Sequence, residues 1–212
     1  MYNNRTIIMN HMKEHSTIYL FMTILFLTGI IFGAILVNSM NFVQKQDLFF
    51  YLEQFFSRIA ESETIENHAI LKESFLFHMK YLVLIFILGL SVIGLPFVWI
   101  LLFIKGLVVG FSVGFLVNQL GINGLFIASV SIAPQNILII PIYISAGSMS
   151  MIFSLKLLQK LFSKKISQPV FQHFSKYIIL FLFLLAFSFV AALLESYLSN
   201  GAMEIMIKSF YQ

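Results

Sequence analysis

Long uninterrupted runs of apolar residues constrain this chain more than any other feature of its sequence. A helix needs about 20 consecutive apolar residues to cross the roughly 30 Å hydrocarbon core of a bilayer. Runs near that length or longer lie at 18–37, 81–104, 105–120, 122–155 and 177–198. The sequence therefore predicts an all-α fold, a polytopic integral membrane helical bundle with about five spans.

The composition excludes the other broad classes of protein. Hydrophobic residues make up 59% of the chain and charged residues only 10%, whereas soluble domains are about half apolar and a quarter charged. The mean hydropathy of +0.93 also excludes a disordered chain. Because the chain has no cysteine, it holds no disulfide, thiolate metal site or thiol nucleophile. We expect membrane lipids around the protein and no nucleic acid among its partners.

The distribution of basic residues predicts the orientation of the spans. The leader 1–17, Lys105 and the segment 156–176 together hold eight of the 13 Lys and Arg residues but only one of the nine acidic residues. Short basic segments stay in the cytoplasm, so the leader and 156–176 are predicted to be cytoplasmic, with Lys105 reaching the interface on the same side. Five crossings then place the tail 199–212 outside. A cleaved signal peptide is the competing interpretation of 18–37, but the run is long and no small-residue cleavage motif follows it.

The run 122–155 is too long for one straight span. Its 34 residues would form a helix of about 51 Å. The broken-helix motif that we identify in it consists of Pro134, Gln135, Asn136 and Pro141. We expect a re-entrant or half-helical element at 122–133 on the outer side, a break at 134–136 and a span at 137–155. Irregular backbone at membrane depth must be buried or line a water-filled cavity. The two amides therefore either satisfy carbonyls freed by Pro141 or belong to a transport site.

The segment 38–80 is the largest region predicted to lie outside the membrane. Between Gln44 and Ile59, apolar residues recur at helical spacing with polar residues between them, which is typical of an amphipathic helix. The candidate docking residues on its apolar face are Phe49, Leu52, Phe56 and Ile59. This face can lie on the outer leaflet, dock a partner or pack on the protein's own bundle, and the sequence leaves these alternatives open. A second helix is predicted at 66–80, leading directly into the next span.

Glycines recur at every fourth residue in two of the predicted spans. The helix-packing candidates are Gly29 and Gly33 in the first span and Gly106, Gly110 and Gly114 in the third. This spacing places the glycines on one face of a helix, where a second backbone can approach closely. The second helix can belong to the same chain or to another copy in a homodimer.

No motif in the sequence indicates catalysis, a cofactor or a resident metal. His11, Glu14 and His15 match the H-x-x-E-H pattern of some zinc proteases. They lie in a short leader that no further ligand-bearing domain follows, so we interpret the match as coincidence. The other histidines, among them His78, lack partners at ligand spacing. The span centres are predicted to hold no ionisable residue, which argues against a transporter.

Four segments of the chain carry a family resemblance. They are 26–39 (FLTGIIFGAILVNS), 44–56 (QKQDLFFYLEQFF), 87–121 (ILGLSVIGLPFVWILLFIKGLVVGFSVGFLVNQLG) and 134–141 (PQNILIIP). Together they resemble the stage II sporulation protein M family, in its sporulation branch. Wider relatives often carry a His-Gly pair and an acidic residue where this chain has Gln135, Asn136 and apolar residues. This departure argues against an ionisable transport relay.

The resemblance implies a non-enzymatic membrane scaffold. Sporulation members of the family act in forespore engulfment, in a septal complex with stage II sporulation proteins D and P, which cut peptidoglycan. The implied location is the septal or engulfing cell membrane of a spore-forming bacterium, with the hydrolases on the outer side. A small channel or transporter is the alternative, but the chain shows no clear internal repeat around a midplane site.

Overall fold

The computed structural model describes residues 13–60, 67–162, 170–199, 201, 203 and 205, and the elements over this part of the chain are all helical. In chain order they are α2 (Ser16–Ser39), α3 (Phe42–Ala60), α4 (Asn67–Gly89), the 3₁₀ turn η1 (Val92–Gly94), α5 (Leu95–Ser131), α6 (Ala133–Phe162), α7 (Val170–Leu193) and the π-helical turn η2 (Leu194–Ser199).

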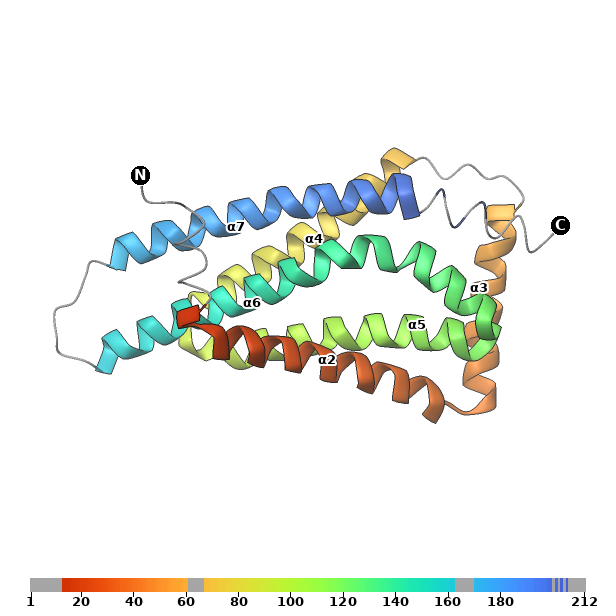
Figure 1. Ribbon diagram of the computed structural model, residues 1–212, viewed down its shortest axis with the longest axis horizontal. Helices are drawn as coiled ribbons and strands as arrows, with labels where there is room; N and C mark the ends of the chain where they lie inside the picture. The colour runs from red at the N-terminus through yellow and green to blue at the C-terminus, as the bar shows by residue number, and fades with distance from the viewer. Residues whose placement is uncertain are drawn as a thin grey trace.

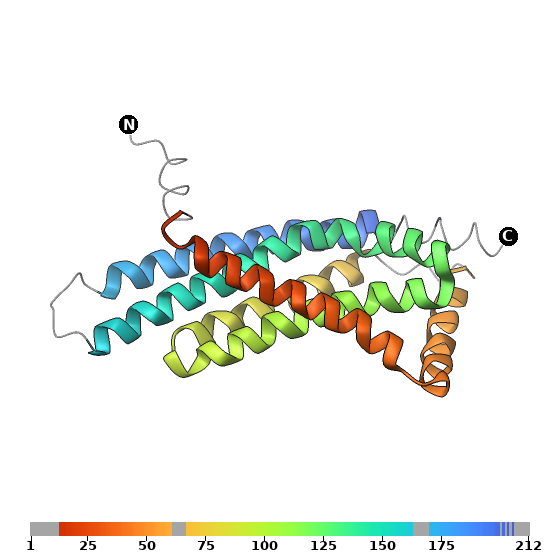
Figure 2. The ribbon, with the colours of Figure 1, turned by 60° about the horizontal axis from the view of Figure 1, so that its bottom comes forward.

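The long helices α2, α4, α5, α6 and α7 lie along one axis, and α3 crosses one end of this bundle (Figure 1, Figure 2). In the described part of the chain, four helical stretches are long and apolar enough to cross a membrane: Ser16–Ser39, Val92–Ser131, Ala133–Lys160 and Phe174–Ser199. Helix α4 lies against α6 and α7, although its amino-terminal half carries charged residues. The prediction of an all-α membrane bundle is confirmed, and the predicted number of about five spans is close.

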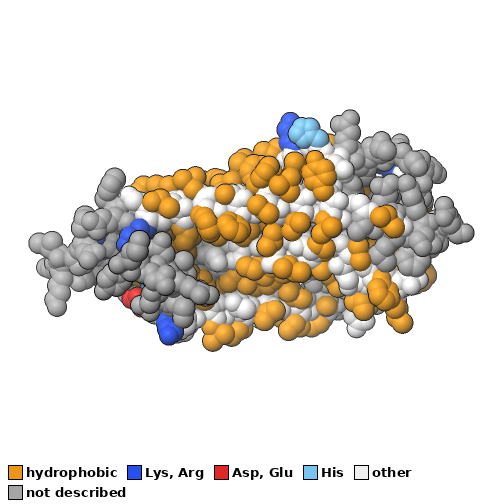
Figure 3. All heavy atoms as spheres, turned by 45° about the horizontal axis from the view of Figure 1, so that its top comes forward, with side chains coloured by type: hydrophobic (Ala, Val, Ile, Leu, Met, Phe, Trp, Pro, Cys, Tyr) orange, Lys and Arg blue, Asp and Glu red, His pale blue; other side chains and the backbone are white. Residues whose placement is uncertain are grey.

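Apolar side chains cover the middle of the bundle's surface. On the face drawn in Figure 3, hydrophobic side chains form a broad band, and charged side chains lie towards its two ends. Ile24 on α2, Ile100 on α5 and Leu182 on α7 are each more than half exposed. A contiguous apolar surface of this extent is typical of a membrane interaction site. Lipid tails are as apolar as these side chains, so the side chains can face lipid without being buried in protein.

The turn between α4 and α5 lies within the predicted span 81–104. Ser91 caps η1, because its hydroxyl oxygen accepts a hydrogen bond from the Ile93 amide at 3.3 Å. Gly94 lies so close to Leu88 that a Cβ would overlap the Leu88 carbonyl. Pro96 falls in the first turn of α5, where its missing N–H breaks no helical hydrogen bond. The structure therefore places the reversal at this turn, before the predicted boundary at 104/105, and Pro96 starts a helix instead of kinking one.

A second reversal occurs at Gly121, inside the helical stretch of α5. Its φ of 59° and ψ of −131° lie in a region that only glycine populates readily. A Cβ at this position would meet open space, so the backbone conformation alone requires glycine. The following residues 122–131 run back in the direction of α6 (Figure 1). They form a short helical element that leads into α6, which corresponds to the half-helical alternative predicted at 122–133.

The predicted break at 134–136 is displaced by two residues: α5 ends at Ser131 and α6 begins at Ala133, so the junction lies at Ile132 and residues 134–136 fall in the first turn of α6. Helical hydrogen bonds continue through the junction: the Ile132 amide donates to the Ala128 carbonyl at 2.8 Å, and the Asn136 amide donates to the Ile132 carbonyl at 3.4 Å. The Asn136 side chain donates to the same Ile132 carbonyl at 2.7 Å. Pro141 frees the carbonyl four residues before it, which is not the carbonyl that Asn136 bonds. The Asn136 side chain therefore satisfies the Ile132 carbonyl at the junction between α5 and α6.

The five candidate packing glycines lie between α2 and α5. A Cβ would overlap a backbone carbonyl of the opposite helix at Gly29, Gly33, Gly106 and Gly110. Gly114 is less crowded, since its Cβ would lie 3.2 Å from the Ala34 Cα. In a membrane, such close backbone contact is a main source of helix association. The five glycines thus form a contact between two helices of one chain, and they give no support to a homodimer.

The main core lies where the long helices meet, and it includes Met22, Leu82, Leu102, Tyr143 and Phe181. Two serines of α6 donate hydrogen bonds to backbone carbonyls of α4 and of the turn that follows it. The Ser150 hydroxyl donates to the Ile85 carbonyl at 2.9 Å, and the Ser154 hydroxyl donates to the Ser91 carbonyl at 2.9 Å. Small hydroxylated side chains let α6 approach α4 closely while their own polar groups stay hydrogen-bonded.

Candidate functional site

A polar cavity of about 400 Å³ opens between α4, α5, α6 and η2. Its apolar walls include Phe77, Val108, Ile132 and Ile139. Its polar lining consists of Glu73, Ser74, His78, Lys105, Ser112, Gln135, Asn136 and Glu195. Ionisable residues within membrane helices are costly, so they mark candidate functional sites. These side chains form the candidate site.

Glu195 is the centre of the polar cluster and comes from the π-helical turn η2. Turns of this kind widen the helix and are frequent at functional sites. Its carboxylate accepts a hydrogen bond from the Ser74 hydroxyl of α4. With its amide nitrogen turned towards the carboxylate, Gln135 of α6 donates to Oε1 at 3.1 Å. Side chains from two other helices thus hold the carboxylate in place.

His78 lies one helical turn after Ser74 on α4 and is only 5% exposed. Its Nδ1 is 2.7 Å from the Tyr143 hydroxyl of α6. Its Nε2 is 3.6 Å from Glu195 Oε2, which is too long for a hydrogen bond. Nε2 is buried without a hydrogen-bond partner among the described residues. A buried polar group left in this way costs about 1–3 kcal/mol, and the group that Nε2 faces is the carboxylate of Glu195.

Lys105 extends from α5 towards the aromatic side chains of α4 and α6. Its Nζ lies 4.7 Å from the centre of the Phe77 ring, 5.1 Å from that of Tyr143 and 5.7 Å from that of Tyr81. Cation–π contacts of this kind contribute about 0.5–2 kcal/mol. Because α5 begins at Leu95, Lys105 lies about 15 Å along the helix. The prediction that it reaches the interface is therefore wrong.

The sequence prediction missed this cluster because it placed the helix ends incorrectly. With the membrane span assigned to begin at 81, His78 fell in the preceding helix outside the membrane, and with a boundary at 104/105, Lys105 fell at a span end. The turn formed by Ser91, Gly94 and Pro96 is the local sequence signal that places the end of α4 and the start of α5 correctly. The approach of Glu195 to these residues is a long-range contact without a local sequence signal.

Helix α3 is fixed at its start by a reciprocal cap. The Gln44 amide donates to the Asn41 side-chain oxygen at 2.9 Å, and the Asn41 amide donates to the Gln44 side-chain oxygen at 3.1 Å. Each side chain thereby satisfies one amide that the helix leaves free. The chain is thus turned from α2 into α3, which then lies across the end of the bundle (Figure 2).

The docking candidates on α3 face the protein's own bundle. Phe56 is 6% exposed and packs in a small core with Leu116, Ile127 and Ala128. Leu52 packs against the same core, and Phe49 is half-buried. The side chain of Ile59 lies outside the described residues. Packing on the bundle therefore accounts for this face, and the apolar side chains that α3 leaves exposed are Phe42, Val43, Phe50, Tyr51 and Phe55.

Within the described part of the chain, no three His, Asp or Glu side chains come together as a metal site. The H-x-x-E-H match lies partly outside that part, since His11 is not among the described residues. The chemistry in reach of the cavity is therefore that of a carboxylate, an imidazole, a phenol and an ammonium group.

A family model described as stage II sporulation protein M matches residues 22–200 of the chain. The matched region begins in α2 and extends past η2, so it includes the bundle, α3 and the cavity. No curated protein and no solved structure matches the chain.

Proposed function

Because the chain belongs to the stage II sporulation protein M family, we propose that this sporulation-related membrane protein is a non-enzymatic scaffold. It organises peptidoglycan hydrolases at the septum, where they remodel the wall during forespore engulfment. The resemblance implies stage II sporulation proteins D and P as the hydrolase partners. The proposal follows the predicted topology, which places α3 on the extracytoplasmic side, where wall enzymes act.

The observation that carries this proposal is the second apolar face of α3. Phe50 and Tyr51 are 63% and 66% exposed, although the opposite face of the same helix is already packed on the bundle. The cap at Asn41 fixes the start of the helix, and the burial of Phe56 anchors it to the bundle through one side chain. A helix with exposed aromatic side chains is suited to dock a partner, because aromatic residues are enriched where partners bind most tightly.

The test is a pair of substitutions on this exposed face. Phe50→Asp combined with Tyr51→Asp should block engulfment and reduce co-purification of the hydrolases, while the protein stays in the membrane at its normal level. The matched control, Phe50→Leu with Tyr51→Leu, keeps the surface apolar and should engulf normally. Normal engulfment by the aspartate variant would refute docking through this face.

The cavity favours a second candidate function, a membrane protein that binds a small polar solute or an ion. The sequence predicted no ionisable residue in the span centres, and that absence argued against a transporter. Lys105, His78 and Glu195 line the cavity, so this objection no longer holds. Glu195→Gln preserves the shape of the side chain and removes its charge. If the cavity works in sporulation, this variant should fail in engulfment while its α3 still captures the hydrolases, and Glu53→Gln on the exposed side of α3 should behave normally. Normal engulfment by Glu195→Gln would exclude a role for the charged cavity.

A further inference from the structure

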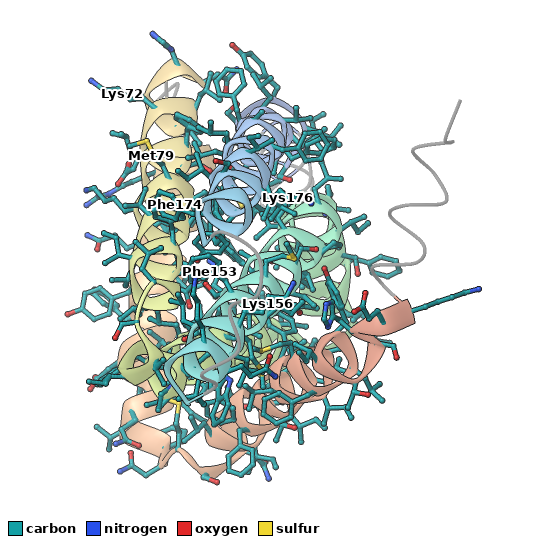
Figure 4. The ribbon with its side chains drawn as sticks, turned by 90° about the vertical axis from the view of Figure 1, so that its left-hand side faces the viewer. Lys72, Met79, Phe153, Lys156, Phe174 and Lys176 are labelled. Atoms are coloured by element: carbon teal, nitrogen blue, oxygen red, sulfur yellow. The ribbon has the colours of Figure 1, made fainter. Side chains whose placement is uncertain are left out.

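A second cavity, of about 220 Å³, lies between α6 and α7 at the end of the bundle where α6 ends and α7 begins. Lys156 of α6 and Lys176 of α7 both line it. Figure 4 looks at this end of the bundle and shows the two lysines on neighbouring helices, with Phe153 and Phe174 beside them. The remainder of its lining is apolar apart from one tyrosine hydroxyl, and it includes Met149, Ile152 and Leu180.

The floor of this cavity is rigid. Tyr177 is 2% exposed, and its ring stacks on that of Phe153 at a centroid distance of 4.6 Å and an angle of 12°. Its hydroxyl is 2.8 Å from the Ser150 hydroxyl and donates to the Phe86 carbonyl at 3.1 Å. Because the ring is held on its face and at its hydroxyl, the hollow does not need a bound molecule to keep its shape.

The position of the two lysines along the helices matches the edge of a bilayer. Helix α6 ends at Phe162 and α7 begins at Val170. Lys156 therefore lies about 9 Å before the end of α6, and Lys176 lies about 9 Å after the start of α7. At this depth the ammonium groups reach the headgroup layer while the stems lie along apolar surface.

The charged side chains that line this cavity are all of one sign. The residues that line the cavity include no acid, and the sequence from 156 to 176 holds five lysines and no acid. The apolar floor excludes a fully hydrated anion from the deeper part of the hollow. Its complement is a molecule with an anionic head and an apolar body.

We propose that this cavity binds an anionic phospholipid, with the lipid phosphate between Lys156 and Lys176 and the glycerol and first acyl carbons over Phe153 and Leu180. Basic pockets between membrane helices on the cytoplasmic side bind such headgroups. The phosphate group is shared with soluble anions, but the apolar floor selects the lipid. The lipid then bridges α6 and α7.

The experiment measures the thermal unfolding midpoint of the full chain in mild detergent during titration with phosphatidylglycerol, phosphatidylcholine or inorganic phosphate. Phosphatidylglycerol should raise the midpoint of the wild-type protein, and the other two should not. A basic residue near an anionic headgroup contributes about 1 kcal/mol, so Lys156→Gln with Lys176→Gln should weaken the apparent affinity for phosphatidylglycerol about 30-fold.

The matched control removes the same charge elsewhere, through Lys72→Gln and Lys80→Gln, two exposed lysines of α4. It should bind phosphatidylglycerol as the wild-type protein does. Equal weakening in this control would overturn the site in favour of unspecific surface attraction. An equal response to inorganic phosphate would show a soluble-anion site, and an equal response to phosphatidylcholine would show no headgroup selection; either result refutes the proposal.

Discussion

A leucine at Gly110 would force apart the closely packed helices α2 and α5. A Cβ at this position would lie 2.7 Å from the Ile30 carbonyl carbon and Cα, whereas ordinary contact begins at 3.4 Å. The Ile30 carbonyl oxygen lies closer still, so even alanine requires the two backbones to separate by more than about 0.7 Å, given the rigidity of packed helices. Overpacking of this kind costs about 1–3 kcal/mol. We expect about 2 kcal/mol for Gly110→Ala and 3 kcal/mol or more for Gly110→Leu, whose branched side chain lies across the whole contact.

The assay is thermal unfolding in mild detergent, in which 1 kcal/mol shifts the midpoint by about 2–4 °C for a protein of this size. Gly110→Leu should lower the midpoint by about 6–12 °C. Val117→Leu adds a methylene group at a partly exposed position of the same helix and should have little effect. Gly114→Ala should cost less than Gly110→Ala, because its Cβ would lie 3.2 Å from the nearest atom. A wild-type midpoint for Gly110→Leu, or the reverse order for the two alanine variants, would refute this interface.

Three further predictions address the turns, the core and the topology. Gly121→Ala should lower stability by about 1–3 kcal/mol, because φ of 59° with ψ of −131° is strained for any residue with a Cβ; an unchanged unfolding midpoint would contradict the reversal at this residue. Tyr177→Phe should cost about 1 kcal/mol in the same assay through the lost hydrogen bond to the Phe86 carbonyl, and a gain in stability would contradict that bond. Since the chain has no cysteine, single cysteines at Glu53 and Lys160 can be labelled with an impermeant thiol reagent; position 53 should react from outside intact cells and position 160 should not, and the opposite pattern would reverse the proposed orientation.

The features that the sequence predicts well depend on composition and on short-range periodicity. Apolar length alone indicates a membrane bundle. Glycines at every fourth residue indicate a face for close backbone contact, and the structure places Gly106 and Gly110 against α2. The sequence did not determine whether the opposite helix belongs to the same chain. The glycine spacing indicates which face of a helix carries small residues, but it does not indicate which helix packs against that face.

The features that the sequence prediction missed depend on where helices end and on contacts between distant residues. A boundary at 104/105 removed Lys105 from the membrane interior, and only the turn at Ser91–Pro96 places it correctly. The break was predicted at 134–136, but α6 begins at Ala133, because proline is tolerated in the first turn of a helix. Pro141 lies further along α6, where membrane helices also tolerate proline. The contact of Ser74 with Glu195 joins residues 121 positions apart in the chain, and no local pattern encodes it.

Site-specific photo-crosslinking from α3 in sporulating cells tests the central claim most directly. A photoreactive side chain at Phe50, which is 63% exposed, is compared with one at Phe56, which is 6% exposed. The scaffold account predicts that position 50 forms an adduct with a peptidoglycan hydrolase during engulfment, whereas position 56 forms crosslinks only within the chain. Adducts of position 50 with lipid alone, in cells that engulf normally, would contradict the account.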